Sequence, residues 1–163
     1  MLATPHIIAS GAVGKLARRP WIAFPVALGL HFLLDFVPHT DSHGLFGSPY
    51  GYTRPEVIAG ILDFLFGAIL VILVVGRRPG YKVMYGAAFF GIVLDILENV
   101  PPGGHWWRTS AATGWISAFH HHFQNNVPPS KWPLGFGTQI LLLIVAIWII
   151  RFPSKAAAKH RHV

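Results

Sequence analysis

The sequence contains no cysteine and few charged residues. Because none of its 163 residues is cysteine, disulfide bonds, thiolate metal ligands and a cysteine nucleophile are excluded. Only 12% of the residues are charged, about half the fraction that is usual in a soluble domain. In contrast, 53% are hydrophobic, and the mean hydropathy is +0.50. This composition argues against an ordinary soluble domain and against a disordered chain, and the length suits one domain.

Acidic residues are also scarce. The chain has 6 aspartates and glutamates against 13 lysines and arginines, which gives a formal net charge of +7. Such a basic chain often binds nucleic acid. Here, however, the basic residues flank long apolar runs, a pattern that favours a membrane surface. We therefore expect the lipid bilayer as a partner and no nucleic acid. The sequence predicts no particular oligomeric state.

Four apolar runs predict membrane helices, at residues 21–37, 58–75, 83–97 and 133–150. A helix of 17 or 18 residues, as in three of these runs, spans about 26 Å. The hydrocarbon core of a bilayer is about 30 Å thick. The sequence thus predicts an all-α fold, a polytopic integral membrane bundle with four long transmembrane helices.

Two weaker segments complete the predicted architecture. Residues 4–14 predict a short N-terminal half-helix that enters only part of the membrane, and residues 111–123 predict an interfacial or re-entrant helix. Thr53, with Glu56 three residues later, fits a helix N-terminus. We expect one helical membrane domain over residues 1–152 and a basic cytoplasmic tail over residues 153–163.

Charge is distributed unevenly around the apolar runs. Because basic loops mark the cytoplasmic side, we expect the N-terminus outside and the C-terminus inside. All six acidic residues and eight of the ten histidines then fall on the outer side. The basic residues assigned to the inner side are Lys15, Arg18, Arg19, Arg77, Arg78, Lys82, Arg151, Lys155, Lys159 and Arg161.

The outer histidines and acids predict a metal site. His31 and Asp35 are four residues apart and share a helix face. Ionisable groups beside apolar segments usually face a partner, a cavity or an ion, and mixed imidazole and carboxylate ligands suit a divalent metal. We expect zinc first, with manganese or iron as alternatives. The candidate ligands are His6, His31, Asp35, His39, Asp95, His120 and His121, and the candidate catalytic groups are Glu98 and Asp63.

Other interpretations stay open for these residues. His31 and Asp35 could form a buried ion pair, and Asp63 could simply bridge two helices. The acids that close the third apolar run could pair with Arg54 or Arg108 instead of a metal.

Four short segments carry motifs of histidine, aspartate and glycine. They are TPH at 4–6 with ASGAVG at 9–14, GLHFLLDFVPH at 29–39, GIVLD at 91–95 and FHHH at 119–122. These motifs resemble the membrane-bound, metal-dependent hydrolase family, which includes LexA-regulated inner-membrane proteins and is distantly similar to zinc-dependent phospholipase C. The resemblance implies an integral protein of a prokaryotic cytoplasmic (inner) membrane. It also implies a divalent site formed by His6, His31, Asp35, Asp95 and one histidine of residues 120–122.

From these features we expect a metal-dependent membrane hydrolase with an outward-facing site, acting on a lipid phosphoester. Arg54 and Arg108 are the basic groups that could receive a phosphate. Two alternatives use the same residues: a transporter of metal ions or protons, and a non-catalytic membrane scaffold in which acids and histidines only pair helices.

Overall fold

The computed structural model describes residues 1–46, 53–100 and 103–152. Over these ranges the fold is all-α, as predicted, with nine α-helices, one 3-10 turn and an isolated backbone bridge between His39 and Asn126. The predicted tail at residues 153–163 lies outside the described residues, as does part of the loop that follows Pro38.

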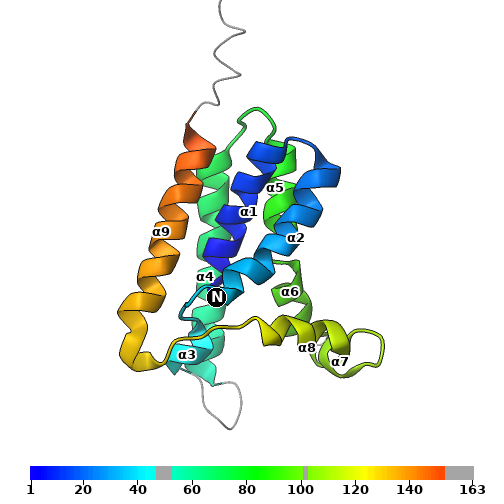
Figure 1. Cartoon of the computed structure of the whole chain (residues 1–163), viewed down its shortest axis with the longest axis vertical. Coiled ribbons are helices and arrows are strands. Elements are labelled where there is room, and N and C mark those ends of the chain that lie inside the picture. Colours follow the sequence, from blue (N-terminus) through cyan, green and yellow to red (C-terminus); the bar gives the residue numbers. More distant parts are fainter. Residues whose placement is uncertain (47–52, 101–102, 153–163) are drawn as a thin grey trace, which may run out of the picture.

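Five helices form an upright bundle (Figure 1). The α1–α2 and α4–α5 connections and the C-terminus of α9 lie together at one end of the bundle, which we call the basic end because Arg18, Arg78 and Arg151 lie there. The bundle helices are α1 (Ala3–Ala17), α2 (Pro20–Phe36), α4 (Arg54–Val75), α5 (Tyr81–Phe90) and α9 (Trp132–Arg151).

Shorter helices gather at the opposite end, which we call the site end (Figure 1). There α2 stops at Phe36, two residues before Pro38, and α4 starts with the predicted cap. Thr53 and Glu56 form a capping box, in which each side chain accepts a hydrogen bond from the backbone of the other residue. The short elements are α3 (Ser42–Phe46), α6 (Val93–Asn99), α7 (Gly103–Thr109), α8 (Gly114–His122) and η1 (Pro129–Lys131).

Helix α1 lies at the centre of the bundle. The predicted half-helix at residues 4–14 is a helix, but it is longer than expected and packs against α2, α4, α5 and α9. Small residues permit this close packing. A Cβ atom at Gly14 would lie 2.6 Å from the Cα atom of Met84, closer than such atoms come in proteins. The buried core around α1 includes Ile8, Val75 and Ile150.

The third predicted membrane helix, residues 83–97, is wrong as a continuous element. Helix α5 ends at Phe90, the chain turns at Gly91 and Ile92, and α6 starts at Val93. The backbone of Ile92 has φ −124° and ψ −4°, outside the helical range. The break turns α6 away from the line of α5 and carries Asp95 toward α2 and α8.

Two helical segments of the described chain are long and apolar enough to cross a membrane. They are Arg54–Val75, with a mean hydropathy of 2.8, and Pro129–Arg151, with 2.2. Only 17% and 22% of these apolar stretches are buried inside the protein, whereas a core helix of a soluble protein is mostly buried. Helix α2 is apolar but has only 17 residues. Four long membrane helices are therefore not shown.

Candidate metal centre

Four side chains from three helices converge at the site end. They are His31 and Asp35 of α2, Asp95 of α6 and His120 of α8. His31 Nε2 lies 2.9 Å from His120 Nε2, 3.4 Å from Asp35 Oδ2 and 3.7 Å from Asp95 Oδ1. His120 Nε2 lies 3.0 Å from Asp35 Oδ2 and 3.7 Å from Asp95 Oδ1. The sequence predicted all four residues as ligands, and the fold brings them together.

The donor set fits a divalent metal ion. In a tetrahedral site with metal–ligand bonds of about 2.0–2.2 Å, the ligand atoms lie about 3.3–3.6 Å from one another. The distance between the two histidine nitrogens and their distances to the Asp35 and Asp95 oxygens, 2.9 to 3.7 Å, bracket that range. Two carboxylates would offset the charge of a divalent ion, and two imidazoles complete a mixed nitrogen and oxygen set.

His31 is held by a backbone carbonyl group. Its Nδ1 atom donates a hydrogen bond to the oxygen of Gly91, at 2.8 Å. In the neutral ring, Nε2 then has a free lone pair that faces the cluster. The break between α5 and α6 therefore positions two ligands. The backbone oxygen of Gly91 holds His31, and the start of α6 brings Asp95 into the cluster.

His120 is held from its other side by a carboxylate. Glu98 Oε1 lies 3.1 Å from His120 Nδ1, and both side chains are buried. Burial alone lowers the pKa of His120, but the contacts with Asp35 and Glu98 outweigh burial and raise it to about 10. A carboxylate behind a histidine ligand is a common support in metal sites, since it fixes the ring and increases its basicity. Glu98 thus lies behind the cluster rather than in it.

His6 borders the same cluster from α1. Its ring stacks on His31 with 4.2 Å between centroids, and its Nε2 lies 3.1 Å from Asp35 Oδ1. The same oxygen of Asp35 accepts a hydrogen bond from the Met1 amino group at 2.8 Å. His6 Nδ1 is buried and has no hydrogen-bond partner among the described residues. His6, His31 and Asp95 also lie close enough to share an ion. A buried nitrogen without a partner is costly, which supports a ligand role.

Gln124 belongs to the site, although the sequence analysis missed it. Its Nε2 donates to Asp35 Oδ2 at 2.8 Å, while its Oε1 lies 3.2 Å from His39 Nε2. His39 is buried but lies outside the cluster, and its side chain is linked to the Asp35 carboxylate through Gln124. The available signal was spacing, because Gln124 follows His120 by four residues and so shares its side of the chain.

Two further predicted site residues also lie outside the cluster. Asp63 of α4 accepts hydrogen bonds from the backbone N–H groups of Ala3 and Thr4 and from the Thr4 hydroxyl. It therefore caps the N-terminus of α1. His121 is largely exposed, and its Nε2 lies 3.4 Å from Glu98 Oε2.

The cluster opens to its surroundings at Asp95. The side chain of Asp95 is 25% exposed, whereas the side chains of His31, Asp35 and His120 are at most 2% exposed. On another side, Phe32 meets the rings of both His31 and His120 edge-on. Phe32 also packs on the rings of Phe119 and Phe123, so aromatic carbon shields the histidines there.

Comparison with known proteins identified no relative of this chain. No family model, no curated protein and no solved structure matches this chain. The resemblance to membrane-bound, metal-dependent hydrolases therefore rests on the four short motifs alone.

Proposed function

We propose that this chain is a metal-dependent hydrolase of the membrane, with its catalytic metal bound by His31, Asp35, Asp95 and His120. The observation that carries the proposal is the convergence of three helices on two histidine nitrogens 2.9 Å apart. Each of these nitrogens lies 3.0 to 3.7 Å from an oxygen of Asp35 and from an oxygen of Asp95. Buried ionisable groups are costly even when they pair with one another, and a bound ion would offset part of that cost. The motif resemblance points to the same residues.

Hydrolysis of a lipid phosphoester is the reaction that we propose. The oxygen of a water molecule forms a bond to phosphorus, the bond from phosphorus to the lipid alcohol breaks, and the departing alcohol keeps a proton from the water. A bound divalent ion supplies Lewis acidity for the phosphoryl group and lowers the pKa of water. Zinc is the first candidate, and manganese or iron are the alternatives.

The protein residues have separate tasks in this proposal. Asp95 is the partly exposed ligand, so substrate and water approach the cluster beside it. Glu98 holds His120 as a ligand and is a positioning residue rather than a base. Arg108 donates a hydrogen bond to the backbone oxygen of Glu98 and brings positive charge to this end of the bundle. It is therefore the better placed of the two predicted arginines to attract a phosphate.

The membrane orientation follows from charge. The loops at the basic end carry Arg18, Arg19, Arg77 and Arg78, and acids gather at the site end. The positive-inside rule then orients the site end toward the outside of a cytoplasmic membrane. Helices α4 and α9 are the proposed spans, and the exposed Trp115 and Phe119 of α8 suit the membrane interface.

The test combines metal analysis with activity. Purified protein should bind about one zinc ion, and the Asp35→Asn and His31→Ala variants should lose it. Zinc-loaded protein in vesicles of phosphatidylcholine and phosphatidic acid should release inorganic phosphate, whereas both variants should not. Asp41→Asn is the matched control, because Asp41 caps α3 through Gly44 and lies outside the cluster.

Three outcomes contradict the proposal in different ways. Zinc that stays bound after loss of both His31 and Asp35 removes this site. Tight zinc binding without hydrolysis of any phospholipid indicates a structural site, in which all four side chains stay bound and none, Asp95 included, gives way to water. Zinc uptake into vesicles without hydrolysis indicates a transporter instead.

A further inference from the structure

Helices α2 and α5 pack against each other in the bundle, and an apolar groove between them starts at the basic end (Figure 1). A stacked aromatic pair joins the two helices there, with 4.7 Å between the ring centres of Phe24 and Phe90 and 13° between their planes. A Cβ atom at Gly86 would lie 2.5 Å from the Phe24 ring, so this glycine lets the ring approach α5. The volume of the groove is about 440 Å³, within the range of about 300–1,000 Å³ that is usual for ligand sites. The lining residues are Pro20, Trp21, Phe24, Pro25, Leu28 and Phe90.

An arginine lies where this groove meets the basic end. The guanidinium of Arg19 is 5.9 Å from the centre of the Trp21 ring, a distance at which a cation and an aromatic face attract each other. Both side chains are exposed, and Trp21 belongs to the lining. No group of the described residues accepts a hydrogen bond from this guanidinium. Its N–H donors, whose fork matches the oxygens of a phosphate, are therefore available to a ligand.

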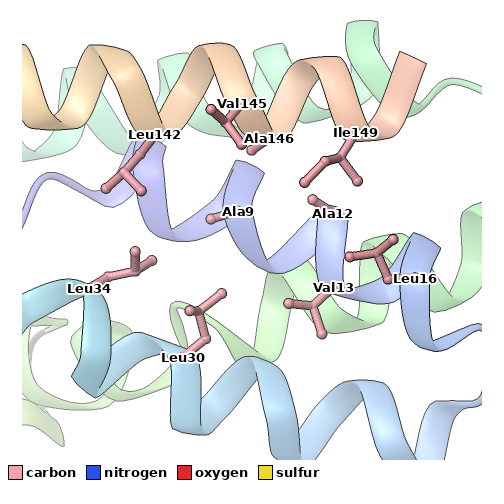
Figure 2. A pocket seen from close by; sticks show the side chains of 10 residues that line it. All are labelled: Ala9, Ala12, Val13, Leu16, Leu30, Leu34, Leu142, Val145, Ala146 and Ile149. Atoms are coloured by element: carbon pink, nitrogen blue, oxygen red, sulfur yellow. The ribbon is translucent and has the colours of Figure 1, made fainter. Parts of the chain in front are cut away.

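A second groove, between α1, α2 and α9, lacks such a group. Figure 2 shows that the side chains lining it, among them Ala9 and Leu30, are all aliphatic. Lys15 lies beside Ile149 at one end of this groove, but its ammonium group already donates hydrogen bonds to three backbone oxygens at the C-terminus of α9. Of the two grooves, the one between α2 and α5 therefore combines an apolar surface with an available cation.

The basic end as a whole favours an anionic partner. Arg77, Lys82 and Arg151 are exposed there, and all six acids of the chain lie in other parts of the described structure. In the proposed orientation this end faces the cytoplasmic leaflet, whose anionic lipids attract basic residues. Trp21 and Trp148 are exposed within about one helical turn of the same end, where tryptophan commonly marks the membrane interface. The groove therefore begins at the level of the lipid head groups and continues into the hydrocarbon.

We infer that the groove between α2 and α5 binds one anionic phospholipid of the cytoplasmic leaflet, with the phosphate on Arg19 and one acyl chain along α2. From Pro20 to Leu28 the groove follows α2 for about 12 Å. A zwitterionic lipid carries the same phosphate together with a cation, which the basic end repels, so the charge of this end selects the anionic lipid. Binding here needs the bilayer but not the metal centre, and it is independent of the proposed hydrolysis.

Native mass spectrometry of the full chain in a non-ionic detergent tests the head group. Dioleoyl phosphatidylglycerol and dioleoyl phosphatidylcholine have the same acyl chains and differ in charge. We expect one phosphatidylglycerol to bind at least about fivefold more tightly than phosphatidylcholine, and Arg19→Ala to reduce its affinity by about fivefold, the effect of one basic group beside an anionic lipid. The matched control is Arg77→Ala, which removes an exposed arginine of the same end outside the lining and should change the affinity by less than about twofold.

The acyl chain is tested at the far end of the groove. Leu28→Trp fills this end and should lower the affinity for dioleoyl phosphatidylglycerol by about fivefold. Val26→Trp, at an exposed position outside the lining, should leave it within about twofold. The melting temperature verifies folding. If Leu28→Trp does not fold, the unaltered protein supplies the test, because a phosphatidylglycerol with a diazirine in one acyl chain should label the peptides that contain Phe24 and Phe90. Unlabelled phosphatidylglycerol should compete with this labelling, and phosphatidylcholine should not.

Several results would overturn this lipid site. Equal affinity for the two lipids shows that the groove does not select a head group. Equal losses in Arg19→Ala and Arg77→Ala show a general attraction to the basic end instead of a site at Arg19. A lipid-free dimer that buries the groove shows that a second copy of the chain is its occupant. Failure to bind zinc or to hydrolyse a lipid changes none of these measurements, so it contradicts only the proposed function.

Discussion

The imidazole of His31 reaches across the bundle to the backbone oxygen of Gly91, at 2.8 Å, where α5 gives way to α6. This bond links the helix that carries two predicted ligands to the break that positions a third. The approach is tight, because a Cβ atom at Gly91 would lie 1.9 Å from Ser10 Oγ and 2.4 Å from Ser10 Cβ. The packing of α1 against Gly91 thus controls the geometry of His31.

Replacement of Gly91 tests this relationship. Gly91→Ala should lower the free energy of unfolding by about 1–3 kcal/mol through overpacking. It should also weaken zinc binding by about 10–100-fold, because the carbonyl group that orients His31 moves. Thermal unfolding and zinc titration measure the two effects. Gly137→Ala is the control, since the added carbon would meet no atom within 4 Å beyond its own stretch of helix backbone. Equal behaviour of the two variants would show that Gly91 does not position His31.

Glu98 should act on the metal through His120. Glu98→Gln keeps the volume of the side chain but removes the charge that faces His120 Nδ1 at 3.1 Å. We expect zinc affinity to fall by about 10–100-fold, with a smaller change in thermal stability of the metal-free protein. His121→Ala is the comparison, because His121 contacts Glu98 at 3.4 Å from the exposed side. Should His121→Ala weaken zinc binding equally, Glu98 acts through His121 instead.

Asp63 should contribute to the stability of the fold and not to zinc binding. Its carboxylate accepts hydrogen bonds from the backbone of Ala3 and Thr4, and an isolated capping group contributes about 0.5–2 kcal/mol. Asp63→Ala is expected to lower the melting temperature in detergent and leave the zinc content unchanged. Loss of hydrolysis at unchanged stability and zinc content would restore the catalytic role that the sequence predicted for Asp63.

Zinc binding should release a proton from His120. In the metal-free protein, Asp35 and Glu98 outweigh the effect of burial and raise the pKa of His120 to about 10, so the ring is protonated at neutral pH. A metal ligand nitrogen must be free of its proton, so protons compete with zinc below that pKa. Calorimetry in two buffers of different ionisation enthalpy should detect about one released proton, and apparent affinity should rise by about tenfold per pH unit between about pH 6 and 8. An affinity that is independent of pH would exclude His120 as a ligand.

Much of this arrangement was visible in the sequence because it depends on local spacing. His31 and Asp35 share a helix face at any helix length, and the apolar runs near α4 and α9 set where those helices lie. Thr53 and Glu56 form the predicted cap for the same reason. Interactions between residues within one or two helical turns can be predicted from sequence spacing alone, without the tertiary fold.

Features that depend on tertiary packing were not visible. The run at 83–97 contains no proline, so nothing in its hydropathy indicated the break at Gly91, which depends on contacts with Ser10 and His31. Gln124 is a neutral amide and was passed over among charged candidates, although its role depends only on distance to Asp35. Asp63 was predicted as catalytic because an acid near an apolar run suggests chemistry, whereas it caps a helix that lies far away in sequence.

The central place of α1 has a consequence for biosynthesis. The four helices that surround it all follow it along the chain, and α9 emerges from the ribosome last of these. A segment this short, with Thr4, His6 and Ser10 along it, cannot hold itself within lipid without those neighbours. We therefore expect α1 to complete its packing only after α9 has been translated, so that the centre of the bundle forms late in folding.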